Sequence, residues 1–204
     1  MHFAWHESRT AYAAAADWFV RTAALVGDRW SDPGLGDWDV RALVGHTSRS
    51  FLTVEEYVAR PAAAVEIETC ADYFRVVRDL AKGDAVTQRG REAGEQLGAD
   101  PVAAVAELAD RVGRLLDSCD GTEVVTTIAG GMRLADYLPT RVFELAVHTA
   151  DLAVALGAPL GVPPAAAEQA LAIVGDLAAE DGATAGLLLL RATGRRVEGD
   201  LTVL

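Results

Sequence analysis

Residues 134–156 read LADYLPTRVFELAVHTADLAVAL, and this stretch decides the fold that the rest of the chain has to fit. Leucine, valine and alanine occupy almost every side of the helix that a period of 3.6 residues predicts, and Gly157 followed by Pro159 predicts its end. A helix that is apolar nearly all round is normally buried. The sequence therefore predicts a long helix at the centre of a helical domain.

A narrow polar ribbon runs along this helix and consists of Tyr137, Arg141, Glu144, His148 and Asp151. At 100° per residue, Glu144 and His148 lie about 40° apart and about 6 Å apart along the axis, so both can reach one point beside the helix. Two metal ligands on one helix need this spacing. The alternative is an ordinary solvated face, because charges of mixed sign commonly occupy the exposed side of a helix. This helix alone leaves both interpretations open.

Turn residues divide the rest of the chain into further elements. Asp37 is expected to cap one helix, and Asp100 with Pro101 predicts the start of another. The expected helices cover residues 6–26, 38–59, 71–97 with a break at Gly83, 101–119, 165–179 and 183–192. A strand or an extended connector is expected at 123–128, and a strand at 197–204. The predicted fold is all-α in the main, a four-helix bundle over residues 1–160 with a short C-terminal α/β extension over 161–204.

Composition excludes several classes of function. With 18 basic and 30 acidic residues the net charge is −12, and no run of Lys or Arg interrupts it, so nucleic acid is not an expected ligand. No apolar stretch approaches the roughly 20 residues that cross a bilayer, and the first residues lack the pattern of a signal peptide. Cys70 and Cys119 stand outside any Cys-x-x-Cys pattern. We expect a cytoplasmic protein with free thiols and no membrane partner.

His46 is the second residue that suggests chemistry. Gly45 precedes it inside an expected helix, where glycine costs about 1 kcal/mol relative to alanine, so something is expected to approach the backbone closely there. Small or uncharged groups share the helical face of His46, and such a face can line a cavity. These groups are Ala42, Ser50, Thr53 and Tyr57. A single histidine is nevertheless more often structural than functional.

Three collinear segments extend the pattern beyond single residues. They read DWDVRALVGH at 37–46, GMRLADYLPTRVFELAVH at 131–148 and TADLAVALG at 149–157. Together they resemble the mycothiol-dependent maleylpyruvate isomerase family of the DinB-like superfamily, over about residues 5–160. The resemblance implies a DinB-like four-helix bundle whose divalent metal, often zinc, is held by His46, Glu144 and His148.

The implied ligands suit activation of a thiol. Three protein ligands leave a coordination position open on zinc, and a thiol bound there would lose its proton while remaining nucleophilic. The resemblance implies mycothiol as the cosubstrate. It also implies addition of the thiolate to a double bond of maleylpyruvate, rotation about the resulting single bond, and elimination to fumarylpyruvate. Nitrogen and oxygen ligands would also suit nickel, iron or manganese, with zinc as the first choice.

The chain departs from the longer family members, which carry a second α/β domain that helps to bind the substrate carboxylates. Only residues 161–204 stand in that place here. Arg191, Arg195 and Arg196 are candidates for a carboxylate contact, although basic residues near a helix end more often cap carbonyls or meet solvent. Metal and thiol binding are therefore more strongly implied than isomerisation of maleylpyruvate itself.

These observations favour an enzyme, a metal-dependent thiol transferase or isomerase that acts on a small electrophile. The alternatives are a metal-binding bundle without catalysis, such as a stress-response or sensor module, and a purely structural bundle. Two groups outside the ligand set are expected to support it. Asp151, or a nearby backbone carbonyl, is expected to accept a hydrogen bond from a ligand histidine, and Arg141 is expected to lie near Glu144. The sequence leaves the oligomeric state open, and a homodimer is compatible with it.

Overall fold

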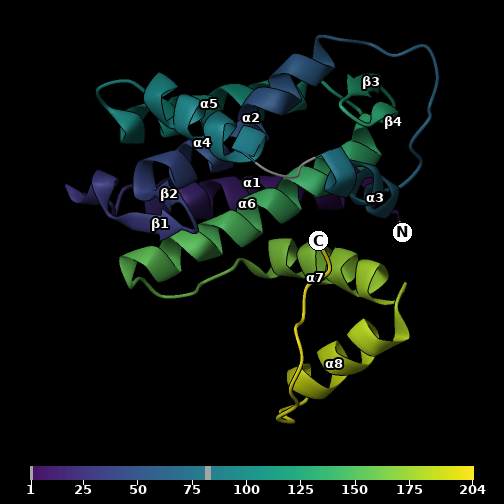
Figure 1. Ribbon diagram of the computed structural model, residues 1–204. Helices are drawn as coiled ribbons and strands as arrows, with labels where there is room; N and C mark the ends of the chain where they lie inside the picture. Colours follow the sequence, from purple (N-terminus) through teal and green to yellow (C-terminus); the bar gives the residue numbers. More distant parts are fainter. Residues whose placement is uncertain (1, 81–83) are drawn as a thin grey trace.

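The computed structural model describes residues 2–80 and 84–204, and most of them are helical (Figure 1). The helices are α1 (Trp5–Ala23), α2 (Val40–Val58), α3 (Cys70–Leu80), α4 (Asp84–Gln96), α5 (Pro101–Asp117), α6 (Leu134–Leu156), α7 (Pro164–Ala178) and α8 (Gly182–Ala192), with one 3-10 turn at Arg29–Ser31. Both α5 and α6 pack against α1 and α2, which closes a four-helix bundle. The predicted mainly helical bundle is confirmed.

The central helix α6 has the bounds that the sequence predicted. Its C-terminus is capped by Gly157, whose backbone adopts φ +62°, a conformation that favours glycine. Its leucines are buried in the core, and the side that meets solvent carries Val147 and Val154. Most of α6 is buried against α1, α2, α3 and α7, and Tyr137 and Arg141 of its polar ribbon are buried as well.

The start of α2 differs from the sequence prediction. The cap is Asp39, whose carboxylate accepts a hydrogen bond from the Ala42 backbone N–H at 2.7 Å, and Asp37 does not cap the helix. The reason is a small antiparallel hairpin in which β1 (Pro33–Leu35) pairs with β2 (Trp38–Asp39). Strand pairing takes Trp38 out of the helix, so α2 begins two residues later than expected.

A second hairpin precedes α6, where β3 (Val124–Thr127) pairs with β4 (Gly130–Arg133). The expected strand at 123–128 is confirmed, and the glycines that follow it form the partner strand. The expected break at Gly83 lies outside the described residues. The expected strand at 197–204 is wrong, because these residues pair with no strand in the part of the chain that the structure describes. The carbonyls of Val197 and Gly199 accept hydrogen bonds from Arg191 instead.

The segment after residue 160 attaches to the bundle through α7, which packs against α1 and α6. Its buried face, with Ile173 and Leu177, joins the same core as the bundle helices, whereas α8 lies apart and contacts α7 (Figure 1). The division of the chain at residue 160 stays a prediction. Within the described residues, no helix is long and apolar enough to cross a membrane.

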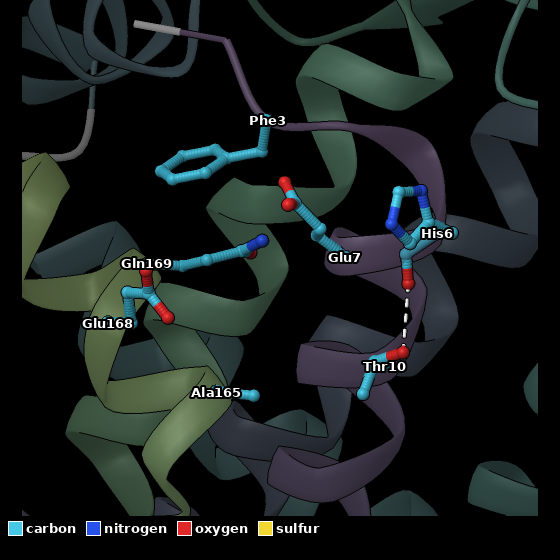
Figure 2. A pocket seen from close by; sticks show the side chains of 7 residues that line it. All are labelled: Phe3, His6, Glu7, Thr10, Ala165, Glu168 and Gln169. Carbon is cyan, nitrogen blue, oxygen red and sulfur yellow. Dashed lines mark hydrogen bonds between the residues drawn. The ribbon is translucent and has the colours of Figure 1, made fainter.

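A cavity of about 210 Å³ lies between the start of α1 and α7 (Figure 2). Its polar groups serve local structure: Glu7 accepts a hydrogen bond from the Ala4 N–H, Thr10 donates to the His6 carbonyl, and Gln169 donates to Ser8. The full lining is Phe3, His6, Glu7, Thr10, Ala165, Glu168 and Gln169. None of the residues that the sequence marked as metal ligands belongs to it.

The close approach expected at Gly45 is confirmed, and its partner is α4. A Cβ atom added at Gly45 would lie 2.1 Å from the Gly94 backbone nitrogen, and one added at Gly94 would lie 2.7 Å from the Arg41 carbonyl oxygen. The two backbones are therefore too close for any side chain between them. This crossing fixes α2, the helix that carries His46.

Replacing Gly45 by alanine tests this crossing. We expect Gly45→Ala to lower the free energy of unfolding by about 1–3 kcal/mol, because the added methyl group must push rigid backbone apart. Gly113→Ala in α5 is the matched control: nothing lies within 4 Å of its Cβ position, so it should gain up to about 1 kcal/mol from helix propensity. Urea denaturation measures both. Equal stabilisation of the two variants would contradict the close crossing.

Candidate metal centre

His46 on α2 meets Glu144 and His148 on α6, although almost the whole bundle separates them along the chain. The Nε2 atom of His148 lies 3.3 Å from Glu144 Oε2, and Nε2 of His46 lies 4.0 Å from the same oxygen. One ligand atom from each residue lies within 4.8 Å of the others, and no other such group of three occurs among the described residues. The structure thus brings together all three residues that the sequence singled out.

The chemistry of the three donors fits a divalent metal. Atoms about 2.1 Å from one tetrahedral ion lie about 3.4 Å apart, so small side-chain rotations are enough to bring these three to that separation. The exposed fractions of the side chains are 18% for His46, 22% for Glu144 and 18% for His148. The group is therefore mostly buried, with part of each side chain still exposed to solvent.

The imidazole of His46 is held between two other rings. The Trp38 ring lies against it at a centroid distance of 4.4 Å, and the His148 ring meets it edge-on at 4.8 Å. Trp38 is itself fixed because its Nε1–H donates to the Thr87 carbonyl oxygen in α4. Among the described residues, the buried Nδ1 atom of His46 has no hydrogen-bond partner, which is unusual for a buried polar atom.

The charge states favour metal ligation by His46 and Glu144. Burial lowers the pKa of His46 to about 3, helped by the charge of His148, so this ring is neutral and keeps a free lone pair. Burial alone would raise the pKa of Glu144, but the hydrogen bond from His148 and the charge of Arg141 lower it to about 2. Glu144 is therefore a carboxylate near neutral pH.

His148 is oriented by two carboxylates. Burial alone would lower its pKa, but hydrogen bonds to Asp151 and Glu144 outweigh burial and raise the pKa to about 9. Its Nδ1–H donates to Asp151 Oδ2 at 3.1 Å, which turns Nε2 toward Glu144 and His46. This is the contact expected of a residue that orients a metal-binding histidine.

Arg141 does not lie on a solvated ribbon. Its side chain is buried with Tyr137, and the guanidinium carbon lies 5.1 Å from the centroid of the Tyr137 ring and 5.4 Å from that of Tyr73. Its Nε–H donates to Thr140 and its Nη2–H to the Tyr73 hydroxyl. The solvated interpretation of the ribbon is wrong at these positions, because α2 and α3 cover this side of α6.

The sequence did not reveal Trp38 as a neighbour of His46. The two residues are eight positions apart, and only the β1–β2 hairpin turns the indole back over the first turns of α2. Arg49 was also missed, although its position one turn after His46 places it on the same side of α2. That spacing was the available signal.

Comparison with known families agrees with this geometry. A family model described as Mycothiol maleylpyruvate isomerase N-terminal domain matches residues 11–153. The chain belongs to this family. The match contains His46, Glu144, His148 and Asp151, and the mainly helical fold agrees with the expected DinB-like bundle. Searches of curated proteins and of solved structures found no match.

Removal of Asp151 tests its effect on the centre. Asp151→Ala should lower zinc affinity by about 10-fold or more, because His148 then loses the hydrogen bond that fixes its orientation. Competition with a chelator of known affinity measures this. Asp110→Ala, at an exposed position on α5, removes the same charge away from the centre and should bind zinc like the unchanged protein. Equal zinc affinity of both variants would mean that Asp151 is only a surface charge.

Proposed function

We propose that this member of the mycothiol maleylpyruvate isomerase N-terminal domain family is an enzyme that uses a divalent metal, zinc as the first choice, to activate a thiol toward a small electrophile. His46, Glu144 and His148 would hold the metal, and mycothiol is the proposed cosubstrate. The observation that carries the proposal is the convergence of these three donors from α2 and α6. Two nitrogens and one carboxylate form the ligand set of catalytic zinc sites rather than of closed structural ones.

When bound, the metal would lower the pKa of a coordinated thiol and so supply a nucleophilic thiolate near neutral pH. The protein's own residues hold the geometry for this. Trp38 fixes the ring of His46, Asp151 fixes that of His148, and both keep their nitrogens turned toward Glu144. The partial burial of the three side chains limits the access of water.

The protein's cysteines are poor candidates for the thiol. Burial raises the pKa of Cys70, and burial together with Glu123 raises that of Cys119, so both favour the unreactive protonated form. Neither belongs to the metal-binding group. An external thiol is therefore the better nucleophile, and the cytoplasm remains the proposed location of the protein.

Two reactions suit this centre. Addition of the thiol across an activated carbon–carbon double bond forms a carbon–sulfur bond and delivers the thiol proton to the neighbouring carbon, which is a transfer. If the carbon–sulfur bond breaks again after rotation about the new single bond, and the neighbouring carbon gives the added proton back to the sulfur, the thiol is released unchanged and the double bond is isomerised. The alternative is a metal-binding module without catalysis, which the match to an N-terminal domain alone also allows.

Cobalt(II) substitution tests the proposal. Titration of the cobalt protein with mycothiol or a close analogue should produce a saturable sulfur-to-metal charge-transfer band in the near ultraviolet, because three protein ligands leave a position for the thiolate. His46→Ala and Glu144→Ala should each weaken or abolish the band, since a two-ligand site retains the metal poorly.

Cys70→Ser and Cys119→Ser are the controls and should leave the band intact, which separates an external thiol from a protein cysteine. A band that saturates would support the enzyme if it is followed either by loss of free thiol when an electrophile is added, which indicates transfer, or by conversion of maleylpyruvate to fumarylpyruvate with the thiol unchanged, which indicates isomerisation. Cobalt binding at His46, Glu144 and His148 without any thiolate band would contradict thiol activation and favour the non-catalytic module.

A further inference from the structure

The cavity between the start of α1 and α7 is acidic (Figure 2). Glu7 lines it from α1 and Glu168 from α7, and no Lys or Arg of the described residues lines it. Both helices begin beside the cavity, and their two N-termini together offset about one negative charge. Two carboxylates therefore leave this place negatively charged without a basic side chain to balance them.

Neither carboxylate is fully engaged by the chain. Glu7 accepts a hydrogen bond from the Ala4 N–H through Oε2, and its Oε1 atom accepts none from the described residues. The Glu168 side chain makes neither a hydrogen bond nor an ion pair in the same part of the chain. Other carboxylates on the surface do find a cation, as Glu180 does with Arg75. The oxygens of the cavity are therefore free to accept hydrogen bonds from a ligand.

A buried amide reaches into the same cavity. Gln169 has an exposed fraction of 3%, and its side chain extends from α7 toward Glu7 of α1 (Figure 2). Its Nε2–H donates to Ser8, whereas its buried Oε1 atom has no hydrogen-bond partner among the described residues. Buried polar atoms rarely lack a partner, and the last torsion of a glutamine side chain is soft. This oxygen can therefore turn toward a donor placed in the cavity.

The remaining walls suit an apolar group. The half-buried ring of Phe3 and the methyl group of Ala165 line the cavity. Its volume of about 210 Å³ is larger than the roughly 150 Å³ of an apolar cavity that binds benzene. The face of an aromatic ring also attracts a cation. The cavity therefore has room for a ring-sized molecule and favours one that carries positive charge.

A metal ion does not suit this cavity. Within the described residues, three possible ligand atoms come together only at the candidate metal centre, so those of His6, Glu7 and Glu168 lie too far apart to share one ion. A charged primary amine fits better. It carries three N–H donors and no acceptor, which matches a set of oxygens that only accept.

We infer that the cavity between α1 and α7 binds a small organic ammonium ion whose charged group lies beside Glu7, Glu168 and Gln169. The apolar part of the ligand would lie against Phe3. This site is separate from the candidate metal centre between α2 and α6, and it does not depend on the chemistry proposed there. Because α1 belongs to the bundle and α7 to the segment after it, an occupied site would add contacts between the two.

Calorimetric titration with benzylamine tests the site, and benzyl alcohol is the uncharged molecule of nearly the same shape. Benzylamine should bind at least about 10-fold more tightly than the alcohol, because only the amine carries a charge for the carboxylates and the Phe3 ring. Glu168→Gln should weaken benzylamine binding by about 3-fold, the size expected of an exposed ion pair, and leave binding of the alcohol unchanged. Glu95→Gln removes an exposed carboxylate from α4, which packs against α2, and this matched control should bind benzylamine like the unchanged protein.

Two further measurements locate the ligand. The side-chain amide signals of Gln169 in a nuclear magnetic resonance spectrum should shift with benzylamine. The zinc-free and zinc-loaded proteins should bind benzylamine equally, and Glu168→Gln should give the same cobalt–thiolate band as the unchanged protein, which separates this site from the metal centre. Binding that requires zinc would place the amine on the metal and overturn the cavity site. Absence of saturable benzylamine binding in the millimolar range, equal binding of amine and alcohol, or equal weakening by Glu168→Gln and Glu95→Gln would also overturn it.

Discussion

The packing of α2 beside α6 is the contact on which the rest of the candidate centre depends. His46 comes from the first of these helices, and Glu144 and His148 come from the second, so the three donors meet only if the two helices keep their register. Packed helices lie about 8–10 Å apart, which two side chains can bridge from either side. The position of α2 is also fixed by α4, because the close contact between Gly45 and Gly94 lets the backbones of these two helices pack directly against each other.

The interior charges form one connected arrangement. Glu144 lies between two histidines, Asp151 holds the outer histidine, and Arg141 closes the row one turn earlier on α6. Buried charges are costly unless they are paired, hydrogen-bonded or bound to a metal. The components of this row are donors and orienting groups of the kinds that metal sites use.

Much of this could be predicted from the sequence where the signal is local. The bounds of α6 follow from its periodicity and Gly157, and the close approach at Gly45 follows from a glycine inside a helix. The pairing of Glu144 with His148 follows from a separation of four residues. The part played by His46 came instead from the family resemblance, since a single histidine on another helix carries no distance information.

The errors arise where tertiary contacts decide. Trp38 was assigned to α2 because the short β1–β2 pairing has almost no sequence signal, and the burial of Arg141 depends on which helices cover that side of α6. The strand expected at 197–204 has the right alternation, but a strand also needs an edge to pair with, which no local pattern reveals. Tertiary context therefore overrides local pattern at the margins of the centre rather than at its donors.

The most direct test of the account is a crystal structure of the zinc-loaded protein with anomalous data collected on both sides of the zinc absorption edge. The account predicts an anomalous peak about 2.0–2.2 Å from a nitrogen of His46, an oxygen of Glu144 and a nitrogen of His148, with Asp151 still bonded to the outer nitrogen of His148. A zinc peak bound elsewhere, or a fully loaded crystal in which His46 points away from Glu144, would contradict it.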